Sequence, residues 1–116
     1  MKNAGILFLC FFSFLSLQAQ MAPIGTWNTG TDNSKVAIQA AEGNYVGTLI
    51  SSDNTEAKLG IQLLKDFKQD GKGWKAKFYA PKRGEWLDAK LETKGNLLLI
   101  TVGSGFLSKT LEWEKE

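Results

Sequence analysis

The chain has 116 residues, including 14 Lys or Arg, 12 Asp or Glu, one Cys and no His. This length corresponds to one domain. The net charge of +2 gives no reason to expect binding to nucleic acid, so we expect no nucleic-acid partner.

The first 19 residues have the pattern of a secretory signal peptide. Lys2 precedes an apolar run over residues 4–17, which is shorter than the roughly 20 residues that span a bilayer. We expect cleavage after Ala19, with Ala22 as a second possible position and an uncleaved anchor as the alternative. The context of Cys10 does not resemble a lipoprotein signal. The sequence therefore predicts a secreted or periplasmic protein with one domain over residues 20–116 and no membrane anchor after cleavage.

Short alternating segments follow in the mature chain. Residues 35–40 and 45–50 read as two strands around a turn at residues 42–44. Residues 59–67 fit either a helix or a strand, because their apolar side chains recur at both spacings. We favour a strand, since the neighbouring segments are all strands.

Residues 73–91 carry the clearest pattern in the chain. Side chains alternate between the two faces of a strand, and Pro81 and Gly84 mark a loop over residues 81–84. Folding about that loop pairs Ala80 with Glu85, Tyr79 with Trp86, Phe78 with Leu87, Lys77 with Asp88, Ala76 with Ala89, Lys75 with Lys90 and Trp74 with Leu91. One face is then wholly apolar. A shift of one residue would expose that face to water, so the pattern determines the register.

Two further strands complete the count. Residues 97–102 and 106–113 are apolar or alternating and are separated by a Gly-rich break. Leu98, Ile100 and Val102 are expected on the apolar face of the hairpin. About eight short strands with Gly-containing turns predict an all-β protein, a small antiparallel up-and-down barrel.

The chain resembles a secreted bacterial family called domain of unknown function 2147, whose members are small and lipocalin-like. The matching positions cover nearly the whole mature chain and are Gly25-Thr26-Trp27, Tyr45-Val46-Gly47, Asp53-Asn54, Gly60, Gly71-Lys72-Gly73-Trp74, Tyr79-Ala80-Pro81, Gly84, Gly103 and Trp113. The opening Gly-x-Trp also resembles the start of calycin barrels, in which the Trp closes one end. The resemblance implies the barrel fold and export rather than an activity.

The sequence departs from this family at three polar positions. Ala80, Thr101 and Glu114 stand where the family usually has an acidic residue, an Arg and a basic residue. A functional site that relatives build on those positions would be absent here.

The mature chain offers little catalytic chemistry. Without His or Cys it has no imidazole base, thiol nucleophile or zinc ligand, and Glu85 and Asp88 fall on opposite faces of one strand. The oxygen-rich residues 51–56 could hold a hard cation, but they lack the spacing of a calcium loop and read as a solvated turn. We expect no enzyme, no metal and no cofactor.

Two sets of residues are candidates for function. An eight-stranded barrel holds one small ligand or is filled by side chains, and the candidate interior ligand-binding residues are Trp27, Trp74, Phe78, Leu87, Ile100 and Trp113. The candidate outer patch consists of Tyr79, Trp86, Leu97 and Leu99. The first set predicts an exported non-enzymatic barrel that binds a small apolar or amphipathic ligand. The second predicts, as the alternative, a protein–protein interaction module of the cell envelope.

Overall fold

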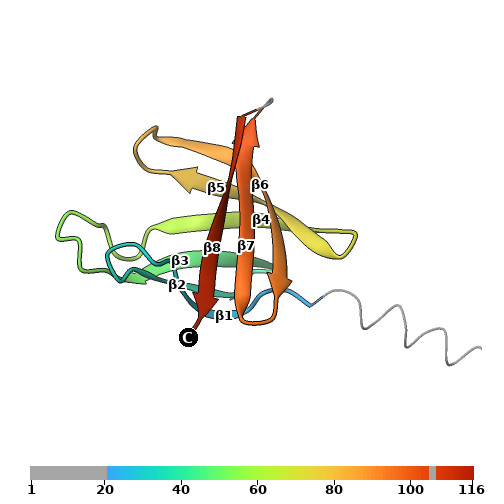
Figure 1. The fold of residues 1–116 in the computed structure, drawn as a ribbon, viewed down its shortest axis with the longest axis horizontal. Helices are drawn as coiled ribbons and strands as arrows, with labels where there is room; N and C mark the ends of the chain where they lie inside the picture. Colours follow the sequence, from blue (N-terminus) through green and yellow to red (C-terminus); the bar gives the residue numbers. More distant parts are fainter. Residues whose placement is uncertain (1–20, 105–106) are drawn as a thin grey trace, which may run out of the picture.

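The computed structural model describes residues 21–104 and 107–116, which form a closed antiparallel barrel (Figure 1). Each strand pairs with the next in the chain, and the last pairs with the first. The eight strands are β1 (Gly25–Asn28), β2 (Lys35–Ala41), β3 (Asn44–Ser51), β4 (Gln62–Asp70), β5 (Gly73–Ala80), β6 (Glu85–Lys94), β7 (Leu97–Ser104) and β8 (Leu107–Lys115). The prediction of a small all-β up-and-down barrel is confirmed. In the described ranges there is no helix long and apolar enough to cross a membrane.

The barrel has two different ends. The β2–β3, β4–β5 and β6–β7 turns lie at one end together with the start of β1 and the end of β8; we call this the closed end. Each of these turns has two residues and includes a Gly at positive φ, as tight hairpin turns require. The β1–β2 loop, the β3–β4 loop and the β5–β6 turn lie at the other end, which we call the open end.

The hairpin of β5 and β6 has the predicted register at every position, from Trp74 opposite Leu91 to Ala80 opposite Glu85. The β5–β6 turn is held by the carbonyl of Ala80, which accepts hydrogen bonds from the backbone N–H groups of Arg83 and Gly84 at 3.1 and 2.8 Å. Leu98, Ile100 and Val102 of β7 lie on the same interior face, as predicted.

Strand β4 begins later than predicted. Leu59 lies in the β3–β4 loop with 61% of its surface exposed, and the strand starts only at Gln62. A bulge between Lys65 and Lys68, with Asp66 at a φ of 54°, then turns both Leu64 and Phe67 into the interior. This bulge explains why the apolar spacing of the segment also fits a helix.

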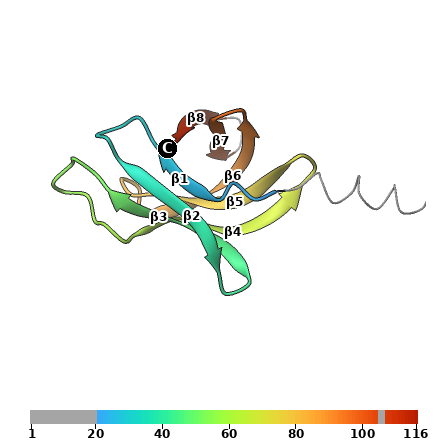
Figure 2. The same cartoon turned by 90° about the horizontal axis from the view of Figure 1, so that it is seen from below.

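The barrel closes over a short seam. Strand β1 pairs with β8 only at Trp27 opposite Lys115 and Asn28 opposite Glu114. Figure 2 shows the C-terminal end of β8 beside β1. The backbone N–H of Glu116 donates to the carbonyl of Thr26 at 3.0 Å and extends the contact by one residue. The part of β8 before Glu114 therefore pairs with β7 alone among the described residues.

Every strand contributes to one apolar core. The buried hydrophobic residues are Trp27, Val36, Ile38, Leu49, Leu64, Phe67, Ala76, Ala89, Leu91, Leu98, Ile100 and Trp113. Side chains therefore fill the middle of the barrel, and any space for a ligand has to lie toward one of its ends.

Candidate ligand-binding site

The start of β1 and the end of β8 seal the closed end of the barrel. The indole Nε1 of Trp27 donates to the carbonyl of Pro23 at 3.0 Å. The Lys115 ammonium lies 5.2 Å from the centre of the Trp27 ring and donates to the carbonyl of Ile24 at 3.2 Å. These contacts draw residues 23–25 across the end of the barrel.

Three aromatic rings fill the neighbouring part of the closed end. Tyr45 packs edge-on against Trp74 and Phe67, with ring centroids 5.7 and 5.9 Å apart, and Phe67 lies 6.3 Å from Trp74. The indole Nε1 of Trp74 donates to the carbonyl of Met21 at 3.1 Å. Trp74 therefore belongs to the packing of the closed end.

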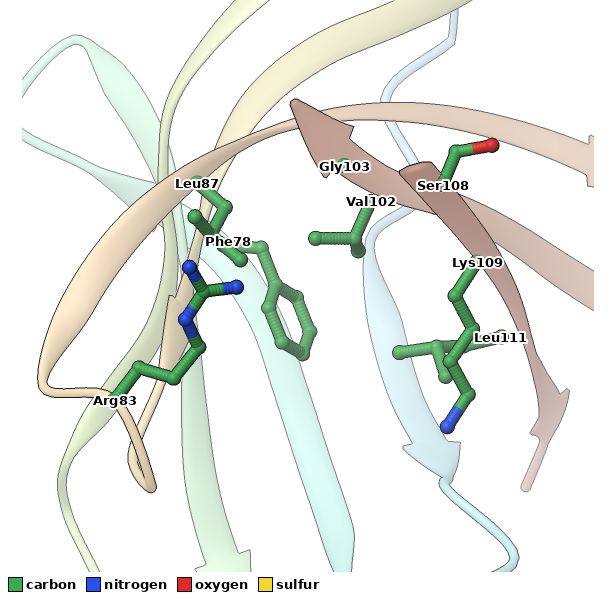
Figure 3. Close-up of a pocket in the computed structure, with 8 residues that line it drawn as sticks. All are labelled: Phe78, Arg83, Leu87, Val102, Gly103, Ser108, Lys109 and Leu111. Atoms are coloured by element: carbon green, nitrogen blue, oxygen red, sulfur yellow. The ribbon is translucent and has the colours of Figure 1, made fainter. Parts of the chain in front are cut away.

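The open end holds a pocket of about 440 Å³ (Figure 3). Its lining comes from β5, the β5–β6 turn, β6, β7 and β8, and consists of Phe78, Arg83, Leu87, Val102, Gly103, Ser108, Lys109 and Leu111. Strands β1 to β4 contribute nothing to it. The pocket therefore occupies the half of the barrel that the β5–β6 and β7–β8 hairpins build.

The walls of this pocket are apolar and its base is the core. In Figure 3 the ring of Phe78 projects between Leu87 on one side and Val102 and Leu111 on the other. Trp113 lies two residues further along the inward row of β8; its ring is 6.3 Å from that of Phe78 and it is buried. A molecule in the pocket would thus rest on packed side chains.

Two cations stand among these apolar walls. Nε of Arg83 lies 2.9 Å from a carboxylate oxygen of Glu85, and both side chains are largely exposed. The Lys109 side chain takes part in no ion pair or hydrogen bond within the described part of the chain. Since none of the eight lining residues is Asp or Glu, the charged residues of the lining are both cations.

The structure distributes the six candidate interior residues over three places. Phe78 and Leu87 line the pocket. Ile100 and Trp113 belong to the core, with 0 and 3% of their surface exposed, and Trp27 and Trp74 belong to the closed end. Their role in binding stays a prediction.

The two cations in the lining were not among the candidates. Lys109, Leu111 and Trp113 are two residues apart along β8. The alternation of side chains in a strand could therefore have placed Lys109 on the interior face. Nothing in the sequence indicates that the Arg83 side chain turns back toward Phe78 from the β5–β6 turn.

The candidate outer patch falls into two separate pairs. Tyr79 and Trp86 are in contact, with ring centroids 5.2 Å apart, and the Lys65 ammonium lies 4.2 Å from the Trp86 ring. Leu99 lies opposite Glu92, six residues along β6 from Trp86, which is about 20 Å at the rise of a strand. Leu97 lies further still, opposite Lys94. All four patch residues are half-buried.

Metal-ligating side chains do not gather in the described ranges, which hold no group of three or more His, Cys, Asp or Glu residues that could bind a metal ion. Side-chain oxygens of the oxygen-rich loop, residues 51–56, accept hydrogen bonds from the backbone of the same loop. Ser52 Oγ accepts from the N–H of Asn54 at 3.1 Å, and Asn54 Oδ1 accepts from the N–H of Glu56 at 2.9 Å.

Comparison with known proteins adds one finding. A family model described as "Uncharacterized protein conserved in bacteria (DUF2147)" matches residues 25–115, from the first residue of β1 to the last of β8. No curated protein and no solved structure matches the chain. The matched unit therefore coincides with the barrel.

Proposed function

The chain belongs to the DUF2147 family of bacterial proteins, and from the pocket in its barrel we propose that it is a non-enzymatic protein that binds a small apolar or amphipathic molecule at the open end. The observation that carries this proposal is an apolar pocket at the open end of the barrel, with packed side chains at its base. Its volume of about 440 Å³ lies in the usual range of small-molecule sites.

The chemistry of the lining supports binding rather than catalysis. The polar side chains of the pocket are one hydroxyl, from Ser108, and the two cations Arg83 and Lys109. In Figure 3 the hydroxyl of Ser108 points away from Phe78. Among the eight described residues of the lining, none carries a carboxylate or imidazole that could take a proton from that hydroxyl. Apolar walls, in contrast, favour any ligand that removes hydrocarbon surface from water.

A pair of adjacent substitutions tests the proposal. Val102 faces the pocket, whereas Thr101 lies on the outer face of the same strand, opposite Lys90 and Thr110. Val102→Phe should fill the pocket and abolish binding of an uncharged polarity-sensitive dye such as N-phenyl-1-naphthylamine. Thr101→Phe should leave the dissociation constant within about twofold of the unmodified protein.

The outcome is read from dye fluorescence together with thermal unfolding of both variants. Equal dye binding by Val102→Phe and the unmodified protein would contradict a site in this pocket. A failure of the unmodified protein to bind any uncharged apolar dye would contradict the function itself.

We also propose that the protein acts after export, in the periplasm or outside the cell. The support is the signal-peptide pattern of residues 1–19, which lie outside the described residues. Cell fractionation with N-terminal sequencing of the mature protein tests this, and the expected mature chain begins at Gln20. An intact Met1 in a cytoplasmic fraction would contradict it.

A further inference from the structure

We infer that the ligand is a single-chain amphiphile with an anionic head group. Its hydrocarbon chain would lie among Phe78, Leu87, Val102 and Leu111, and its head group between Lys109 and Arg83. The inference rests on the proposed function and names the class of molecule that the pocket selects.

Lys109 is the first observation behind this inference. It lies opposite Val102 in the β7–β8 register and shares the inward row of β8 with Leu111 and Trp113. A lysine in an inward row is unfavourable unless its ammonium reaches water or an anion. Lys109 is exposed and has no ionic partner in the described part of the chain, so its charge is available at the rim of an apolar pocket.

Arg83 supplies the second cation from the opposite side. In Figure 3 its guanidinium lies on the Leu87 and Phe78 side of the pocket, across from Lys109. Its ion pair with Glu85 engages Nε, and a guanidinium has four further N–H donors. The pair with Glu85 is 62 and 47% exposed, and exposed pairs are weak. A ligand carboxylate can therefore share or replace Glu85 at Arg83.

The same arrangement disfavours other head groups. A cationic head group would meet two like charges, and the carboxylate nearest to them, that of Glu85, is already paired with Arg83. A neutral head group would gain no charge-assisted hydrogen bond, which is the stronger class of polar contact. An anionic head group can accept charge-assisted hydrogen bonds from a cation of the lining while the chain remains on the apolar walls.

Three probes with the same ten-carbon chain separate these possibilities. Decanoate, 1-decanol and decyltrimethylammonium are titrated into the full mature protein by isothermal calorimetry, each below the concentration at which it forms micelles. We expect decanoate to bind about tenfold more tightly than decanol, and the ammonium probe to bind more weakly than either.

Three substitutions then test which residues cause the preference for decanoate over decanol. Lys109→Met should lower decanoate affinity severalfold, to a value between those of decanoate and decanol for the unmodified protein, because Arg83 remains. Lys90→Met removes the same charge from the exposed outer face of β6 and should change neither affinity. Glu85→Gln releases Arg83 from its ion pair and should tighten decanoate binding about twofold without affecting decanol.

The possible failures are distinguishable. If decanol and decanoate bind equally, the anionic head group is wrong and the proposed function stands. If Lys109→Met and Lys90→Met lose the same decanoate affinity, the preference for decanoate over decanol reflects the net charge of the protein. The site assigned to the head group would then be wrong. If none of the three probes binds, the proposed function fails together with this inference.

Discussion

The side-chain amide of Asn44 pairs with both backbone groups of Phe67. The N–H of Phe67 donates to Asn44 Oδ1 at 2.9 Å, and Asn44 Nδ2 donates to the carbonyl of Phe67 at 3.2 Å. Phe67 directly follows Asp66, where the bulge interrupts β4. The register pairs of β3 and β4 are only Gly47 with Leu64 and Thr48 with Gln62. The Asn44 side chain thus joins the start of β3 to β4 where the backbone ladder has stopped.

Replacing this amide should destabilise the barrel. In Asn44→Ala the part-buried N–H and carbonyl of Phe67 lose their partner, which should lower the free energy of unfolding by about 1–3 kcal/mol. The measurement is urea unfolding followed by circular dichroism. Asn54→Ala is the matched control, since its side chain accepts one hydrogen bond in an exposed loop. A cost in Asn44→Ala no larger than in Asn54→Ala would contradict this role.

The Lys77–Asp88 pair on the outer face of the β5–β6 hairpin predicts that the stability of the fold depends on pH. The hydrogen bond that Lys77 donates lowers the pKa of Asp88 below its ordinary value, and the positive charge of Lys77 adds to this effect. Because the folded-state pKa is the lower one, the pair stabilises the fold above the unfolded-state pKa. That contribution is lost as the pH falls through the folded-state pKa.

Carbon NMR titration of the Asp88 carboxyl checks the direction, and Lys77→Met should move its midpoint up toward the ordinary value. The difference in melting temperature between the unmodified protein and Lys77→Met should be present at neutral pH and shrink in acid. An Asp88 midpoint that is unchanged by Lys77→Met would show that the two side chains do not interact in solution.

The central hairpin shows which parts of such a fold are readable from sequence. Its register follows from strict alternation on both sides of a loop marked by Pro81 and Gly84, and the structure repeats it at every pair. The bulge at Asp66 has no such signal, because an Asp at positive φ looks like any other polar strand residue. Only part of the pocket lining can be predicted from the sequence, for a related reason. Alternation finds Phe78 and Leu87, but it does not show at which end the core stops or where the Arg83 side chain turns.

The contact between Tyr79 and Trp86 should be measurable as a coupling energy. The rings are half-buried with centroids 5.2 Å apart, and such pairs contribute about 0.5–1.5 kcal/mol beyond their burial. A double-mutant cycle with Tyr79→Ala and Trp86→Ala, followed by urea unfolding, should give a coupling in that range. The same variants should bind the uncharged dye normally, because neither residue lines the pocket. Loss of dye binding in Trp86→Ala would move the binding site to the outer face and favour the interaction module.

Lys115 should protect Trp27 mainly through its aliphatic stem. Its ammonium lies over the Trp27 ring and bonds to the carbonyl of Ile24, so the stem covers the closed end beside the Trp27–Pro23 hydrogen bond. Lys115→Ala should speed exchange of the Trp27 indole proton with solvent, as followed by NMR, whereas Lys115→Met should keep most of the protection. The indole proton of Trp74, bonded to Met21, serves as the internal control and should exchange at the same rate in both variants. Equal exchange at Trp27 in Lys115→Ala and the unmodified protein would mean that residues 23–25 close the barrel without help from β8.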